Sequence, residues 1–369
     1  MQALYALALS PIAETKADPH SYGFRPNRSV ADAILQCQNV LAQKNRAKWI
    51  LEGDIKACFD QISHQWLLEH IPMDKFILSQ WLESGFMENN TFFHTKEGTP
   101  QGGIVSPILA NMVLDGLQET IKRVSPRRTK VNFVRYADDF ICTAADPDLL
   151  RDTIKPAIEA FLGERGLSLS QEKTHITHID DGFDFLGFNL RKYNGKFRAK
   201  PSKGNIKSFR AKLKDCCRQL RFRQTHNVIA SLNRTLRGWG NFYRFLSTSK
   251  LFGSLNHYLF ETIWRELKRR HPKKSGSWKK RTYFTSKGGN NWVFFGTEKE
   301  KPKKRKRTQL LFQLGSLHHR RHIKLKSDAT PFDPAFKAYL AKRSTRRVTM
   351  RLRDQLYKFL TTSEWVPTT

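Results

Sequence analysis

The residues VNFVRYADDFICT, from Val131 to Thr143, decide the fold of this chain. Apolar and polar residues alternate on both sides of a short turn, and this period of two is typical of paired antiparallel strands. Asp138 and Asp139 stand side by side in the turn. The stretch therefore predicts a β-hairpin whose tight turn carries two carboxylates.

A third carboxylate ends a second strand-like stretch. Residues 48–55 are apolar at Trp49, Ile50 and Leu51 and then reach Asp54. Acidic residues in turns are often simply solvated, and Asp54 alone would be interpreted in this way. Acids that come together from separate strands instead suit Mg²⁺, which prefers oxygen ligands. Two such ions can activate a 3′-hydroxyl and stabilise a leaving pyrophosphate, so the combination favours a site for two Mg²⁺ ions.

Helix-like and strand-like patterns alternate through the rest of the first half. Helices are expected over residues 29–41, 104–117 and 149–162. Short strands are expected over residues 86–93 and 183–197, the latter turning at Asn194-Gly195. After Asn205 three basic amphipathic helices are expected, with apolar stripes that begin at Ile206, Ile229 and Leu255. The expected fold class is α+β, followed by a small helical bundle.

The charge of the chain is concentrated in its second half. The sequence holds 65 Lys and Arg against 33 Asp and Glu, a net formal charge of +32. Residues 1–190 hold only 19 of these cations and 24 of the anions, so residues 191–369 are intensely basic. A basic half of this size is typical of nucleic-acid binding, whereas a membrane-surface protein usually carries its charge on one amphipathic helix. We expect a nucleic-acid partner and no membrane.

The pattern of cysteines indicates in which cellular compartment the protein is expected. The five cysteines form no CxxC pair, and their spacing suggests no disulfide framework. Thiols of this kind persist in a reducing environment, so a cytoplasmic location is expected.

Five blocks of the first half resemble the reverse transcriptase family, and they occur in the family's order. They are SYGFRP (Ser21–Pro26), GDIKACFD (Gly53–Asp60), GTPQGGIVSP (Gly98–Pro107), FVRYADDF (Phe133–Phe140) and FLGF (Phe185–Phe188). In the second half, LRGWGNFYR (Leu236–Arg244) resembles the maturase-specific domain of group II introns. The chain is thus identified as similar to a group II intron-encoded reverse transcriptase and maturase, over roughly residues 1–345.

The resemblance implies a right-hand polymerase fold in three parts. Residues 1–198 would form partial fingers and the palm, residues 199–290 a helical thumb and maturase-specific domain, and residues 291–369 a basic C-terminal extension. It also implies the substrates, which are an RNA template with a DNA primer, deoxynucleoside triphosphates (dNTPs) and the group II intron RNA itself.

The same resemblance assigns roles in the palm. Asp54, Asp138 and Asp139 would hold the metal ions, with the backbone carbonyl of Ile55 as a further ligand. Phe59 would crowd the 2′ position of the incoming sugar, so that the product is DNA. Gln101 and Gly102 would lie near the template and the incoming base. Lys173 either offers charge to the triphosphate or is simply a surface lysine, and the sequence leaves both open.

In the basic half, several cations interleave with the apolar stripes, so their charged heads are expected to face outward and follow RNA phosphates. The candidate RNA-binding residues are Lys212, Arg221, Arg237, Trp239 and Arg244. The Trp239 ring either stacks on a base or packs in the core, and the sequence leaves both open. His318 to His322 is expected to be a basic RNA-contacting loop rather than a metal site.

Both ends depart from the family's pattern. Met1 to Tyr5 resembles an interior helix of the fingers, so we expect an N-terminal truncation. Asp333 to Leu340 resembles the connector that precedes an HNH-type nuclease, and no cysteine follows Cys217, so that nuclease is expected to be lacking. Three hypotheses stay open: a polymerase that also assists splicing, a catalytically impaired RNA-binding maturase fragment, and a reverse transcriptase attached to another system.

Overall fold

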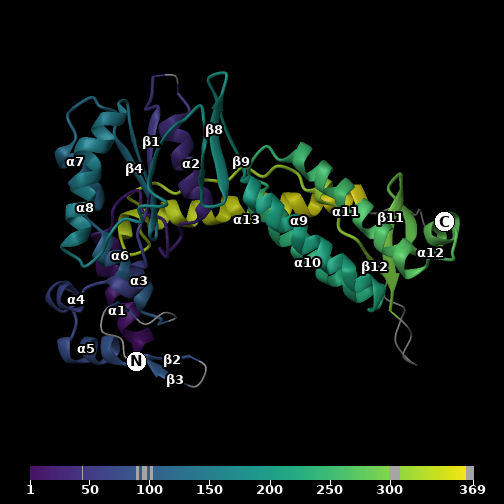
Figure 1. The fold of residues 1–369 in the computed structure, drawn as a ribbon, viewed down its shortest axis with the longest axis horizontal. Coiled ribbons are helices and arrows are strands. Elements are labelled where there is room, and N and C mark those ends of the chain that lie inside the picture. The colour runs from purple at the N-terminus through teal and green to yellow at the C-terminus, as the bar shows by residue number, and fades with distance from the viewer. Residues whose placement is uncertain (44, 89–90, 94–97, 100–102, 299–307, 363–369) are drawn as a thin grey trace. The chain divides into compact units, whose positions relative to one another are not determined.

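The computed structural model of the protein describes residues 1–369 except 44, 89–90, 94–97, 100–102, 299–307 and 363–369 (Figure 1). The chain forms two compact units. The first comprises Met1–Ala199 and His322–Ser344, and the second comprises Lys200–Arg321 and Thr345–Thr369. Helices and sheets occur in both units, which confirms the α+β class. Among the described residues, no helix has the length and apolar character needed to cross a bilayer.

A four-stranded sheet forms the centre of the first unit. Its strands are β1 (Trp49–Asp54), β4 (Asn132–Tyr136), β5 (Asp139–Ala144) and β6 (His175–His178), in the order β4-β5-β1-β6. All neighbouring pairs are antiparallel. The hairpin predicted over residues 131–143 and the strand predicted over residues 48–55 are both confirmed, and β1 and β4 each pair with β5 in a continuous register.

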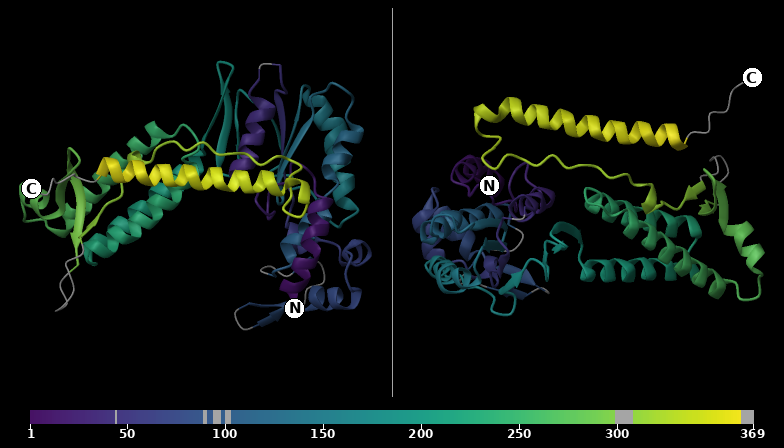
Figure 2. Two further views of the ribbon diagram at one scale, coloured as in Figure 1. Left: turned by 180° about the vertical axis from the view of Figure 1, so that it is seen from behind. Right: turned by 90° about the horizontal axis from the view of Figure 1, so that it is seen from above.

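The first unit also contains a set of helices. They are α1 (Gln2–Thr15), α2 (Val30–Leu41), α3 (Cys58–Gln61), α4 (His64–His70), α5 (Lys75–Glu83), α6 (Ser106–Leu114), α7 (Leu117–Val124), the π-helical turn η1 (Leu149–Ile154) and α8 (Lys155–Gly163). Helix α2 packs against β4, and α7 and α8 lie side by side (Figures 1 and 2). Buried side chains from α4 to α8 and from β1 and β5 form one large apolar cluster.

Smaller strands complete the first unit. They are β2 (Phe86–Glu88), β3 (Thr91–Phe93), β7 (Phe183–Phe185), β8 (Phe188–Tyr193) and β9 (Lys196–Pro201), the last of which reaches into the second unit. The strands expected over residues 86–93 and 183–197 are therefore confirmed. Asn194 and Gly195 both have positive φ, as the predicted tight turn between β8 and β9 requires.

Two expected helices differ from the prediction. The helix expected over residues 104–117 is two helices, since Asp115 leaves α6 with extended backbone and Gly116 adopts a φ of +94°. Only glycine takes this left-handed conformation without strain. The helix expected over residues 149–162 begins with the π-helical turn η1 before α8 continues it.

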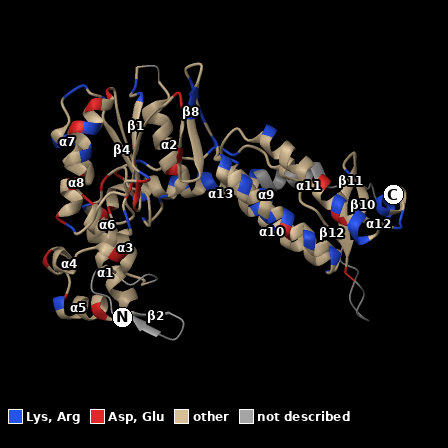
Figure 3. Ribbon diagram, in the orientation of Figure 1, with Lys and Arg blue, Asp and Glu red and all other residues tan. Residues whose placement is uncertain are grey.

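The second unit is built on the three predicted basic helices. They are α9 (Lys203–Arg218), α10 (Thr225–Tyr243) and α11 (Ser249–Arg270), with the 3₁₀ turn η2 (Gln219–Arg221) between the first two. Apolar residues on each helix are buried, whereas Lys and Arg appear along the helix surfaces in Figure 3. The periodicity therefore identified both the helices and their inner faces.

Beyond these helices the structure contains a sheet that the sequence did not predict. Helix α12 (Gly276–Tyr283) leads into β10 (Phe284–Lys287), β11 (Asn290–Thr297) and β12 (Thr308–Leu310), followed by η3 (Leu314–Ser316). The high Lys, Gly and Ser content of this region resembles a linker, which explains why a sheet was not expected.

The segment 322–344 belongs to the first unit, although it follows the second in sequence. It contains η4 (Pro334–Phe336) and the start of α13 (Lys337–Thr362). Asp32, which is fully buried on α2, accepts hydrogen bonds from His322 at 2.9 Å, from the backbone of Leu325 at 2.8 Å and from Arg343 at 3.2 Å. The division into residues 1–198, 199–290 and 291–369 stays a prediction about domains.

Candidate active site

Three carboxylates meet at one end of the central sheet. Asp54, the last residue of β1, stands directly opposite Asp139, the first residue of β5. Asp138 occupies the turn between β4 and β5, and its carbonyl accepts a hydrogen bond from the backbone N–H of Ile55 at 3.3 Å. The structure therefore brings together the four residues that the sequence singled out as metal ligands.

Burial and neighbouring negative charge disfavour ionisation of the two turn aspartates. Burial, followed by the neighbouring charges of Asp54 and Asp138, raises the pKa of Asp139 to about 7. Burial also raises the pKa of Asp138. Carboxyl groups that resist ionisation in this way are stabilised by a nearby cation, and oxygen ligands suit Mg²⁺. The chemistry of the donor set thus fits a hard divalent ion.

The site is not a preformed cation cage. Within the described parts of the chain, no group of three or more His, Cys, Asp or Glu side chains is arranged to hold a metal ion. Instead the ammonium group of Lys173 lies 2.9 Å from Oδ2 of Asp54, and this carboxylate raises the pKa of the lysine. Lys173 reaches the site because the backbone N–H of Ser170 donates to the carbonyl of Asp54 at 2.8 Å.

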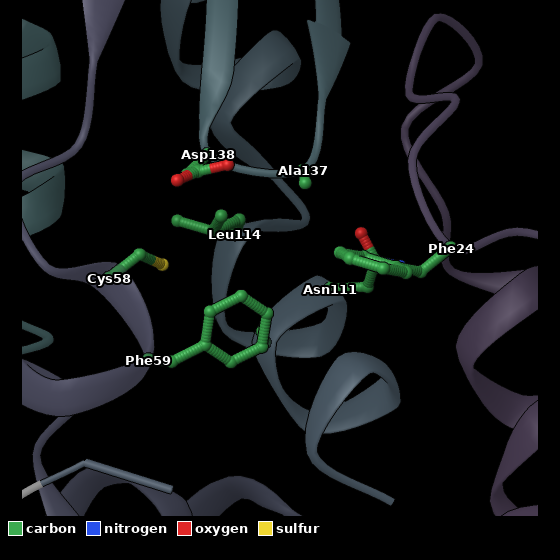
Figure 4. A pocket seen from close by; sticks show the side chains of 8 residues that line it. Phe24, Cys58, Phe59, Asn111, Leu114, Ala137 and Asp138 are labelled. Atoms are coloured by element: carbon green, nitrogen blue, oxygen red, sulfur yellow. The ribbon is translucent and has the colours of Figure 1, made fainter. Parts of the chain in front are cut away.

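A small pocket opens beside the turn. It is lined by Phe24, Cys58, Phe59, Ala110, Asn111, Leu114, Ala137 and Asp138. In Figure 4 Asp138 and Phe59 lie on opposite sides of the pocket, and Phe24 lies to the right of both, beside Asn111. The rings of Phe24 and Phe59 meet edge to face, with centroids 6.1 Å apart. Phe59 thus faces the acidic turn across the pocket. Phe24 also lines the pocket, although sequence reasoning assigned it no role.

Gln101 and Gly102 lie outside the described residues, so the structure says nothing of their predicted contact with template and base.

A buried network of ion pairs and hydrogen bonds contacts the turn that carries Asp138. The Arg135 guanidinium is fully buried and donates to Asn111 at 3.2 Å, to the carbonyl of Ala137 at 3.3 Å and to Asp115 at 2.8 Å. Asp115 also pairs with Arg25, whose side chain is equally buried. Because Ala137 has a φ of +58°, which costs a non-glycine residue about 1 kcal/mol, the contact from Arg135 helps to hold a strained turn.

The SYGFRP block (Ser21–Pro26) packs closely against the same turn. The backbone of Tyr22 donates to the carbonyl of Arg135 at 2.9 Å, and the amide of Asn111 donates to the carbonyl of Gly23 at 3.0 Å. A Cβ atom on Gly23 would lie 2.3 Å from the backbone nitrogen of Ala137, so only glycine fits. Sequence reasoning missed this network, although an arginine within the apolar strand Phe133–Tyr136 was a usable signal.

The candidate RNA-binding residues fall into two groups. Lys212 and Arg237 are exposed on α9 and α10. Arg221 pairs with the buried Glu266, Arg244 is only 6% exposed and donates to the carbonyl of His318, and Trp239 stacks on Phe209 with ring centroids 4.3 Å apart. Contact with RNA is untested for all five, but Arg244 is buried and the half-buried Trp239 packs on Phe209 within the unit.

The loop from His318 to His322 also makes internal contacts. The carbonyl of His318 accepts from Arg244, and the His322 ring donates to Asp32 across 2.9 Å. Each of these contacts lies within one of the two units, and the predicted contact of the loop with RNA stays a prediction.

Comparisons with known proteins agree with this geometry. Residues 1–190 match the reverse transcriptase (RNA-dependent DNA polymerase) family, and residues 206–284 match the group II intron maturase-specific domain. Among curated proteins, the chain is 29% identical to protein YkfC of Escherichia coli, over 53% of this chain and 61% of that protein. It is 27% identical to the group II intron-encoded protein LtrA of Lactococcus lactis, over 79% of this chain and 63% of that protein.

A third relative is a 91 kDa protein in the cob intron of Schizosaccharomyces pombe, 30% identical over 52% of this chain and 31% of that protein. The chain thus spans about three fifths of the length of the first two relatives. The first family match covers more than half of the chain and includes the three carboxylates, the Phe59 pocket and Lys173. The chain therefore belongs to the reverse transcriptase (RNA-dependent DNA polymerase) family, and it carries a group II intron maturase-specific domain.

Proposed function

We propose that this chain is an RNA-directed DNA polymerase of a group II intron and that it also binds the intron RNA to assist splicing and mobility. The observation that carries the proposal is the pairing of Asp54 with Asp139, with Asp138 in the adjoining turn. Acids from two strands at one sheet end are the arrangement that metal-assisted nucleotidyl transfer needs.

In this proposal Asp54, Asp138 and Asp139, with the carbonyl of Ile55, hold two Mg²⁺ ions. When bound, the ions supply the charge that activates the primer 3′-hydroxyl and stabilises the leaving pyrophosphate. The protein's own contribution is to fix the three acids on a rigid sheet, so that they need not reorganise during the reaction. Lys173, which pairs with Asp54 at 2.9 Å, offers a positive charge to the triphosphate of the incoming dNTP.

The Phe59 pocket would select the sugar. Its ring lies beside the acidic turn, where it would exclude a 2′-hydroxyl by contact. Replacement by alanine opens this space, so Phe59→Ala should incorporate ribonucleotides much more readily than the native enzyme while still extending with dNTPs.

A second candidate function is RNA binding without polymerisation. Two observations favour it, the basic surface of the second unit and the lack of a preformed metal cluster among the described residues. The two candidates differ in whether the acidic turn has a catalytic role.

Primer extension on an RNA template with Mg²⁺ separates them. The test compares the native chain with Asp138→Asn and Asp139→Asn, which keep side-chain size but remove the charge that holds a metal. Loss of metal stabilisation worth several kcal/mol should slow extension by about 100-fold or more. Asp148→Asn is the matched control, because this exposed aspartate lies in the same unit outside the acidic turn and pairs with an exposed arginine, Arg151.

RNA binding is measured on the same preparations across a salt series. It should survive both active-site substitutions and weaken steeply with salt, because phosphate contacts release counterions. Extension that continues unchanged with Asn at both positions contradicts the polymerase proposal. Salt-dependent RNA binding by a chain that never extends primers supports the second candidate.

A further inference from the structure

Phe222 is an aromatic side chain that the second unit leaves in solvent. It follows η2 at the corner between α9 and α10, and its side chain is 86% exposed. A ring exposed to this degree is unusual, since phenylalanine is among the residues most often buried. The adjacent Leu220, in contrast, is fully buried and anchors the corner.

The corner that carries Phe222 is held in place by several hydrogen bonds. The backbone N–H groups of Phe222 and Arg223 both donate to the carbonyl of Gln219, at 3.1 and 2.8 Å. From α11, the guanidinium of Arg270 donates to the carbonyls of Leu220 at 2.7 Å and Arg223 at 3.2 Å. The backbone that carries the ring is therefore already fixed, so the corner loses less conformational entropy when a ligand binds.

The corner that carries the ring is rich in positive charge. Residues 214–223 contain four cations and one anion, and residues 265–270, at the end of α11, contain the same numbers. The two stretches meet, because Arg221 pairs with Glu266 and Arg270 bonds to Leu220. Glu266 also pairs with Arg269 at 3.0 Å, so its charge is already matched by two arginines. The corner is thus strongly electropositive.

An exposed ring among cations suits one class of partner. The centres of protein–protein interfaces are depleted of charged residues, which disfavours a protein partner here. Proteins that bind single-stranded nucleic acid combine cations that follow the backbone with aromatic rings on which unpaired bases stack. We propose that Phe222 is a stacking site for an unpaired RNA base, with the surrounding arginines engaging the adjacent phosphates. This inference rests on the proposed RNA binding and adds a specific base-binding site to it.

The test uses the full chain and an oligouridylate that carries one 2-aminopurine, whose fluorescence falls when it stacks. Phe222→Ala should weaken binding by roughly 5- to 100-fold, the range for loss of one stacked base. The slope of log affinity against log salt should not change, because phenylalanine carries no charge and releases no counterions. Phe222→Trp should retain the native affinity, whereas Phe222→Leu, which is apolar but cannot stack, should behave as the alanine variant.

Phe76→Ala is the matched control, because Phe76 is also highly exposed, at 72%, but lies on α5 in the first unit. It should bind as the native chain does. Native affinity in Phe222→Ala, or in Phe222→Leu, would overturn the stacking site and leave salt-dependent RNA binding, and hence the proposed function, intact. A native chain that binds no RNA at any salt concentration would overturn both.

Discussion

Removing the charge of Asp115 should destabilise the first unit, although Asp115 does not belong to the acidic turn. Its Oδ1 atom accepts from both Arg25 and Arg135, and both of these arginine side chains are fully buried. Burial lowers the pKa of Arg135, and Asp115 is the largest charge that opposes this shift. The substitution Asp115→Asn would leave two guanidinium groups buried near each other without their shared anion.

The expected magnitude follows from the burial of the pair. Breaking a buried ion pair by removing one partner costs about 3–5 kcal/mol. Since each 1.4 kcal/mol is a factor of ten, a loss of about 3 kcal/mol should speed global-opening hydrogen exchange by more than 100-fold. Exchange is measured by mass spectrometry on peptides that cover β4 and β5, because these strands report on the first unit alone.

Asp148→Asn is the control for this substitution. Its pair with Arg151 lies at 2.7 Å, but both side chains are more than half exposed. Exposed pairs contribute about 0–1 kcal/mol, so exchange in β4 and β5 should hardly change. Equal rates for the two variants would refute the reasoning, because burial would then have no influence on the cost of losing the anion.

Three further outcomes follow from the same structure. Gly23→Ala should reduce primer extension at least about tenfold, because the new Cβ clashes with the backbone of Ala137 and a shift of about 1 Å in a catalytic group is costly. Folding raises the pKa of Asp139 to about 7. Between pH about 4 and about 7 the native Asp139 therefore holds a proton that the same residue in the unfolded chain has lost. The free energy of unfolding should therefore fall as pH rises through this range. Mg²⁺ competes with that proton and should therefore raise the melting temperature more at pH 8 than at pH 6, and both effects should vanish in Asp139→Asn. Asp32→Ala should expose the segment 322–344 to limited proteolysis, since it removes the acceptor that His322, Leu325 and Arg343 share.

Each of these outcomes has a control. Gly204→Ala should leave extension unchanged, because a Cβ there meets no atom within 4 Å. Asp148→Asn should keep the native pH profile and the native response to Mg²⁺. Asp328→Ala, an exposed position within the released segment, should leave the proteolysis pattern as it is. A control that behaves like its paired variant would contradict the corresponding explanation.

The amino-acid sequence alone predicted the local elements and the acids that they carry. The hairpin around Asp138 and Asp139, the strand that ends at Asp54 and the three basic helices all follow from short-range periodicity, which depends on neighbours a few residues apart. The sheet of residues 284–310 was missed, because its strands lie in a region whose composition resembles a linker.

Contacts between distant residues were decided only by the tertiary structure. The helix expected over residues 104–117 is interrupted at Asp115, whose carboxylate pairs with Arg25 and Arg135. No local pattern in the sequence reveals these pairs. Asp32 binds a segment about 300 residues further along the chain. Whether a cation faces outward or the interior likewise depends on which carbonyls and carboxylates surround it in space. Arg244, which directly follows α10, is therefore buried, whereas Arg237 within α10 is exposed.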